Sequence, residues 1–178
     1  MPAAPPKEQL RLAVTVIVKV IGQIPCFHVY EEYVASRFGD TDAEIALQAT
    51  MHNAALDSTL ISLRCFNEFF RPGGRSDDVR AHHFPGVSMA PFLRPEDHQS
   101  IDKYLAHITV TRADIVTRPW FLDEMTLCGL QHGIEFLSVI DAGFPLHSEA
   151  ATNELRGIQE IGRRFLRKIQ KIIKSNEV

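Results

Sequence analysis

Three ionisable residues, Asp102, Lys103 and His107, interrupt an apolar and helix-like pattern in the stretch IDKYLAHIT, residues 101 to 109. At 100° per residue, Lys103 and His107 share one flank of a helix, and Asp102 shares the other flank with His98. A neighbouring ammonium group favours a neutral imidazole, which can accept a proton. The pattern is therefore that of a general base at His107. The alternative is an ordinary surface histidine that hydrogen bonds to water or to a neighbour.

The wider context of this stretch carries a family resemblance. SIDKYLAHITVTR is preceded by DSTLISLRCFNEFF and DDVRAHHFPG and followed by RPWFLDEM. Over roughly residues 41 to 140 the chain resembles the HEPN superfamily of small all-helical domains, and within it the abortive-infection, AbiU-like branch. The DKYLAH core is the most specific part of this resemblance.

The resemblance implies a metal-independent ribonuclease that needs no cofactor. Its signature is an arginine, a polar residue and a histidine after four to six intervening residues, in a groove between two protomers. The histidine would deprotonate the ribose 2′-hydroxyl, and the cation would hold the phosphate. His107 matches the histidine. The positions expected for the arginine hold Ser100, Ile101 and Asp102, so Lys103 is the nearest cation.

A second polar group, Arg64, Asn67 and Glu68, lies in the apolar segment LRCFNEFF. Arg64 and Glu68 are four residues apart, which suits an ion pair within one helix. In the alternative, this helix faces the His107 helix, Arg64 replaces the missing arginine, and Glu68 orients a histidine. The candidate catalytic residues are therefore His107, Lys103, Asp102, Arg64 and Glu68.

Several further residues are candidates for binding nucleic acid. Arg112 follows His107 by five residues and could contact a phosphate, and Asn67 belongs to the polar group above. The C-terminal segment from about 149 to 174 is the one basic concentration, and Arg163, Arg164 and Arg167 lie within it. With one apolar face, such a helix could dock on a bundle and turn a cationic face outward. A solvated surface without a ligand is the alternative.

Helical periodicity dominates the chain and predicts an all-α fold. We expect one helical-bundle domain over residues 1 to 178, with a short N-terminal tail at 1 to 6. The pattern contains two long antiparallel helices and a loop-rich connection at about 71 to 94. One helix is expected from about Thr41 to Phe70, with Thr41 and Glu44 at capping-box spacing. Its apolar stripe runs from Ile45 and Ala49 to Phe70.

Composition narrows the function classes. A net charge of −3 excludes a uniformly cationic polyanion binder, so a nucleic-acid surface would be a local patch. The three scattered cysteines predict neither a metal site nor a disulfide framework, and we expect a cytoplasmic protein without membrane association. The expected partners are a second copy of the chain, RNA or a nucleotide, and an antitoxin or other protein. The competing class is an inactive HEPN-like module that binds a protein or a nucleotide.

Overall fold

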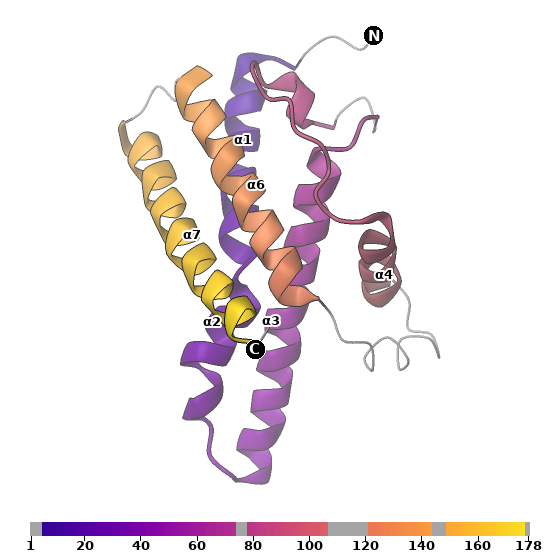
Figure 1. The fold of residues 1–178 in the computed structure, drawn as a ribbon, viewed down its shortest axis with the longest axis vertical. Coiled ribbons are helices and arrows are strands. Elements are labelled where there is room, and N and C mark those ends of the chain that lie inside the picture. Colours follow the sequence, from indigo (N-terminus) through magenta and orange to yellow (C-terminus); the bar gives the residue numbers. More distant parts are fainter. Residues whose placement is uncertain (1–4, 74–77, 107–120, 144–148, 177–178) are drawn as a thin grey trace.

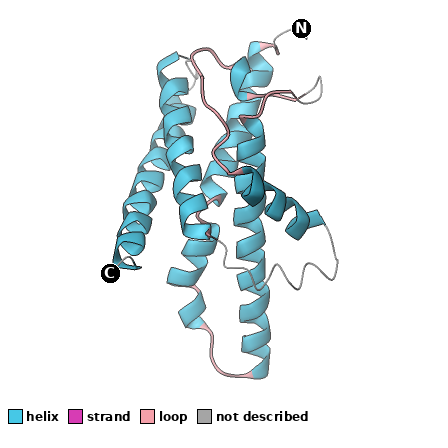
Figure 2. Cartoon of the chain, turned by 45° about the vertical axis from the view of Figure 1, so that its right-hand side comes forward, coloured by secondary structure: helices cyan, strands magenta, loops and turns pink. Residues whose placement is uncertain are grey.

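The computed structural model describes residues 5–73, 78–106, 121–143 and 149–176, and these ranges contain helices and loops but no strand (Figure 2). The expected all-α fold is therefore confirmed for this part of the chain. Its α-helices are α1 (Lys7–Gln23), α2 (Cys26–Tyr33), α3 (Asp42–Phe69), α4 (Pro95–Ala106), α6 (Leu122–Gly143) and α7 (Glu149–Asn176). Two short 3-10 turns, η1 (Ala35–Arg37) and η2 (Ala81–His83), lie in the connections.

The long helices lie side by side, with α3 and α6 running in one direction and α1 and α7 in the other (Figure 1). α1 and α3 are antiparallel, and so are α6 and α7. α6 packs against α7 and α3, while α1 contacts α3, α6 and α7. α4 packs on α3, on the side of the bundle away from α7. The α3–α4 contact and the outer surface of α7 are thus two separate places for a functional site.

Helix α3 begins as the sequence predicts. The Thr41 side chain accepts from the Glu44 backbone N–H, and the Glu44 carboxylate accepts from the Thr41 N–H, which completes a capping box. The predicted apolar stripe is buried only in the second half of the helix, where Leu60, Leu63 and Phe66 lie in the core. Ile45 and Ala49 are exposed, because this part of α3 extends beyond α6 and packs against α2 and η1 on its other side.

Aromatic side chains fill the centre of the bundle. Phe136 of α6 is fully buried and meets Phe66, Phe69 and Phe70 of α3 at ring-centroid distances of 5.1 to 6.3 Å. Phe84, from the connection between α3 and α4, packs on Phe136 at 5.6 Å. Buried aromatic rings contribute large areas to the core, so this cluster fixes the long connection against α3 and α6.

Two glycines allow the packing of α6 against α1 to be tested. A Cβ at Gly133 would lie 2.8 Å from Cγ2 of Ile21, a buried and β-branched side chain, whereas a Cβ at the exposed Gly157 would meet nothing within 4 Å. Alanine at either position gains about 1 kcal/mol of helix propensity. Gly157→Ala should therefore stabilise the fold by about that amount. Gly133→Ala should be about 1–3 kcal/mol less stable than Gly157→Ala in urea unfolding, and equal stability would contradict the close contact.

The N-terminal segment is the most apolar part of the described chain. Residues 7–37 are long and apolar enough, by length and composition, to cross a membrane. Of the apolar 18-residue stretch within them, 33% is buried inside the bundle. Five of the apolar side chains of α1 belong to the core: Leu10, Val14, Ile17, Val18 and Ile21. Core packing therefore accounts for part of this apolar character, while Leu12 and Val16 of the same helix are exposed. The expectation of no membrane association stays a prediction.

Candidate functional site

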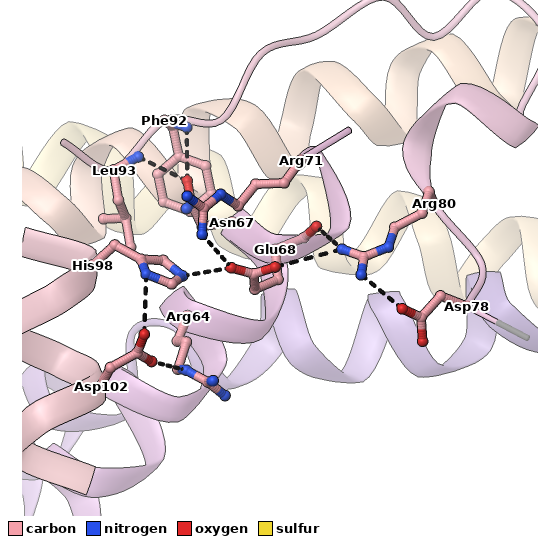
Figure 3. A network of polar contacts seen from close by, with 10 residues as sticks. All are labelled: Arg64, Asn67, Glu68, Arg71, Asp78, Arg80, Phe92, Leu93, His98 and Asp102. Carbon is pink, nitrogen blue, oxygen red and sulfur yellow. Dashed lines mark hydrogen bonds and ion pairs between the residues drawn. The ribbon is translucent and has the colours of Figure 1, made fainter. Parts of the chain in front are cut away.

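A network of charged side chains joins α3 to α4 (Figure 3). Arg64 of α3 donates through Nε to the carboxylate of Asp102 on α4. The other oxygen of Asp102 lies 3.3 Å from Nδ1 of His98, one turn earlier on the same helix. Arg64 thus pairs across the two helices rather than with Glu68 on its own helix. This contact brings two of the predicted catalytic residues, Arg64 and Asp102, together.

Glu68 is the centre of the same network. One of its oxygens lies 2.8 Å from Nε2 of the buried His98, although this contact lacks the alignment of a good hydrogen bond. Arg71 donates to the same oxygen at 2.7 Å, and Nη1 of Arg80 lies 3.5 Å from the other oxygen. Arg80 also donates to the backbone carbonyl of Glu68 and, at 2.7 Å, to Asp78. Glu68 therefore approaches a histidine, which is the arrangement of the second interpretation of the sequence, and that histidine is His98.

The charges in this network are matched. Three arginines face three carboxylates, and His98 lies between two of those carboxylates, Glu68 and Asp102. His98 is buried and the Arg80 side chain is only 13% exposed, so their contacts with carboxylates are structural, because a polar or charged group removed from water requires a partner. The side chains of Arg64 and Arg71 differ from these two, since they are 43% and 48% exposed. Asp102 accepts a hydrogen bond from Nε–H of Arg64, and among the residues drawn in Figure 3 none contacts the two terminal guanidinium nitrogens.

The network makes stability depend on pH. Burial alone would raise the pKa of Glu68, but the hydrogen bond from Arg71 and the charges of Arg71, His98 and Arg80 outweigh it and lower that pKa below 4.5. A lowered pKa stabilises the fold above the unfolded value, and this contribution is lost as pH falls through the folded value. We therefore expect Glu68→Gln to be less stable than wild type at pH 7, with the difference shrinking below about pH 4.5.

Urea unfolding at several pH values checks this prediction. Glu135→Gln, at an exposed position on α6, is the control and should follow the wild-type curve. A constant gap between the Glu68→Gln and wild-type stabilities from pH 7 to pH 3 would show that ionisation of Glu68 does not contribute.

Asn67 has a structural place rather than a place at a ligand surface. Asn67 is only 2% exposed. Its amide oxygen accepts hydrogen bonds from the backbone N–H groups of Phe92 and Leu93 at 2.9 and 2.8 Å. These two bonds hold the connection against α3 immediately before α4 begins. The side chain faces the protein interior, and the expected contact of Asn67 with nucleic acid stays a prediction.

Of the remaining candidates near α4, the structure describes Lys103 alone. Lys103 is exposed on α4, one residue beyond Asp102. His107 and Arg112 lie outside the described residues. α4 is described as far as Ala106, the residue before His107. Asp102 and Lys103 lie near this end of the helix.

The outer face of α7 carries the predicted basic residues. From residue 163 to residue 171, five of nine residues are cationic and none is acidic: Arg163, Arg164, Arg167, Lys168 and Lys171. All five are exposed, while Ile169 is buried and Phe165 and Leu166 are half-buried. At 100° per residue the cations occupy an arc of about 140°. We call these five residues the α7 basic face.

Acidic residues engage two of these five cations. Arg164 pairs with Glu160 at 2.6 Å, and Lys168 pairs with Glu32 of α2. Arg163, Arg167 and Lys171 have no ion pair within the described part of the chain. The α7 basic face therefore keeps an excess of positive charge that a polyanion can neutralise.

Two features of these sites could not be predicted from the sequence: the place of Arg80 in the network and the contact of His98 with Glu68. Arg80 lies in a connection, where no periodicity marks a buried cation, although the adjacent acids in DDVR are a signal for an ion pair. His98 shares a helix face with Asp102, and this spacing correctly indicated their contact. Its approach to Glu68 depends on how α4 packs on α3, which spacing along one helix does not give. Among the described residues, no cluster of histidine, cysteine and acidic side chains has the geometry to hold a metal ion.

Comparisons with protein-family models, with curated proteins and with solved structures found no match for this chain. The resemblance to the HEPN superfamily therefore stays a prediction from the residues quoted above. Two pieces of geometry bear on function: the charge-matched network between α3 and α4, with its half-exposed arginine, and the basic face of α7.

Proposed function

We propose that this chain is a helical-bundle protein that binds single-stranded RNA through the α7 basic face. The observation that carries the proposal is the run of five exposed cations without an acid between residues 163 and 171. The apolar side of the same helix packs on α6 and α1, so docking fixes which face points outward. The five cations extend over about 12 Å of helix. Such a stripe can contact successive phosphates of one strand.

The charge balance of the whole chain supports a local binding surface. The chain carries a net charge of −3, so attraction of a polyanion requires positive charge gathered in one place. The network between α3 and α4 does not provide this, because its arginines face carboxylates. The α7 basic face does provide it, with three cations outside any ion pair in the described ranges.

Fluorescence anisotropy with a labelled oligouridine tests this function. If three to five phosphates are contacted, the logarithm of the association constant should fall with the logarithm of the salt concentration with a slope of about −2 to −3.5. An association constant that does not change with salt, or no binding at low salt, would contradict RNA binding by this face.

Metal-independent RNA cleavage is a second candidate, and a specific observation favours it. Asp102 holds Arg64 at Nε, so the terminal guanidinium nitrogens of a half-exposed arginine are available beside the last described turn of α4. The resemblance to the HEPN superfamily implies a phosphate-holding cation near His107, in a groove between two protomers. In this candidate Arg64 and Lys103 would hold the phosphate, and His107 would be the base.

Incubation of RNA with the protein in excess chelator tests the second candidate. Cleavage that leaves a 2′,3′-cyclic phosphate and is lost in His107→Ala would support it. If RNA stays intact while it binds, the chain is a binding module without this activity. If His107→Ala cleaves as fast as wild type, the base is another group.

A further inference from the structure

The end of α2 presents an exposed aromatic ring to α7. Tyr33 is the last residue of α2, and it is 52% exposed. Nζ of Lys168 lies 5.7 Å from the centroid of the Tyr33 ring. Lys168 also pairs with Glu32, so the ammonium group is held beside the ring from two sides. An exposed aromatic ring next to a cation is the arrangement on which nucleic-acid bases stack in single-strand-binding proteins.

A pocket of about 290 Å³ surrounds this ring, close to the lower end of small-molecule sites at about 300 Å³. It is lined by Glu32 and Tyr33 of α2 and by Ile161, Arg164, Phe165 and Lys168 of α7. Ile161 is exposed and borders this pocket. The pocket therefore combines an apolar side chain, two aromatic side chains, two cations and one carboxylate.

The pocket is continuous with the α7 basic face. Arg164 and Lys168 line both the aromatic pocket and a neighbouring hollow of about 600 Å³, whose other lining residues include Arg167 and Lys171. A nucleotide has the same two parts, since an apolar base face is linked to an anionic phosphate. A cation such as Lys168 can contact a phosphate while the base occupies the apolar part of the pocket.

We propose that this pocket binds one unpaired nucleobase, stacked on Tyr33, with the flanking phosphates held by Arg164 and Lys168. The proposal rests on the RNA-binding function above and names the subsite that makes it selective for single strands. Bases in a duplex are already stacked and paired, so their faces are closed to Tyr33. Glu32 sets a limit on affinity, because its carboxylate competes with the phosphate for Lys168.

An abasic oligomer separates base stacking from phosphate contacts. The experiment measures the affinity of the full chain for an oligouridine and for an abasic oligomer of equal length and charge. Wild type should bind the oligouridine about ten-fold more tightly. Tyr33→Ala should lose this preference and bind both oligomers with the abasic affinity, whereas Tyr33→Phe should keep it. Glu32→Gln should tighten the binding of both oligomers by freeing Lys168.

Phe121→Ala is the matched control. Phe121 is 53% exposed and has Arg94 at 5.4 Å from its ring centroid, but it precedes α6 and does not line the α7 pocket. This variant should keep the wild-type preference for the oligouridine. Unchanged helical circular dichroism would show that each variant is folded.

The outcomes distinguish the two proposals. Equal affinity of wild type for the two oligomers, or a preference that survives in Tyr33→Ala, overturns the stacking site and leaves RNA binding intact. Failure of wild type to bind either oligomer overturns both proposals. Binding to phosphatidylserine vesicles without binding to either oligomer also overturns both, and would assign the α7 basic face to an anionic membrane surface.

Discussion

Replacing Asn67 by leucine should lower the free energy of unfolding by about 3 kcal/mol, within a range of about 2–5 kcal/mol. The amide oxygen of Asn67 accepts from two backbone N–H groups, those of Phe92 and Leu93. Leucine has a similar volume but no acceptor, so the buried Leu93 N–H and the part-buried Phe92 N–H would both lose their protein partner. Each unsatisfied buried donor costs about 1–3 kcal/mol.

Urea unfolding measures the size of this effect, and hydrogen exchange shows its location. The amides of Phe92 and Leu93 should exchange faster in Asn67→Leu, because their protein acceptor is gone. Asn53→Leu, at an exposed position of the same helix, is the control and should change stability by less than about 0.5 kcal/mol. A loss below about 0.5 kcal/mol in Asn67→Leu would show that the two donors find other partners.

The second large effect is expected at the α7 basic face. The double variant Arg163→Glu, Arg167→Glu removes two cations that have no ion pair in the described ranges, and it adds two negative charges. Each phosphate contact on a single strand contributes about 0.7 to the salt slope. Loss of two contacts should therefore weaken RNA binding about 25-fold in roughly 0.1 M salt, before the added repulsion is counted.

The control for this variant has the same change in net charge. Lys7 and Lys19 are exposed on α1, outside the α7 basic face, and their double replacement by glutamate also shifts the charge by −4. If general electrostatic attraction accounted for binding, the two double variants would lose affinity equally. The proposal expects the α7 variant to lose at least ten times more affinity than the α1 variant.

Helices α3 and α7 show which features of the fold could be predicted from the sequence and which could not. The capping box at Thr41 and Glu44 is a local signal, and the structure contains it. Exposure was harder to predict at both ends of the bundle. Ile45 lies beyond the reach of α6, and Ile161 borders a pocket. Periodicity shows which side chains share a helix face, whereas burial depends on whether another helix covers that face.

The same distinction explains the candidate site. The pairing of His98 with Asp102 follows from a spacing of four residues on one helix. The partners of Arg64 and Glu68 depend on the packing of α4 against α3, so the ion pair within α3, one of the two interpretations of their spacing, gives way to contacts between helices. Tyr33 gave no signal as a site residue, because a tyrosine in a short helix is as common in a core as on a surface. Its exposure beside Lys168 is a property of the fold.

Photochemical cross-linking of bound oligouridine, followed by mass spectrometry of the cross-linked peptides, tests the central claim most directly. The measurement locates the RNA on the folded chain without any substitution. The proposal predicts cross-links at Tyr33 of α2 and within residues 161–171 of α7, and their loss at high salt. Cross-links confined to α4 and residues 107–120, with none on α2 or α7, would contradict binding at the α7 basic face and would direct attention to the contact between α3 and α4.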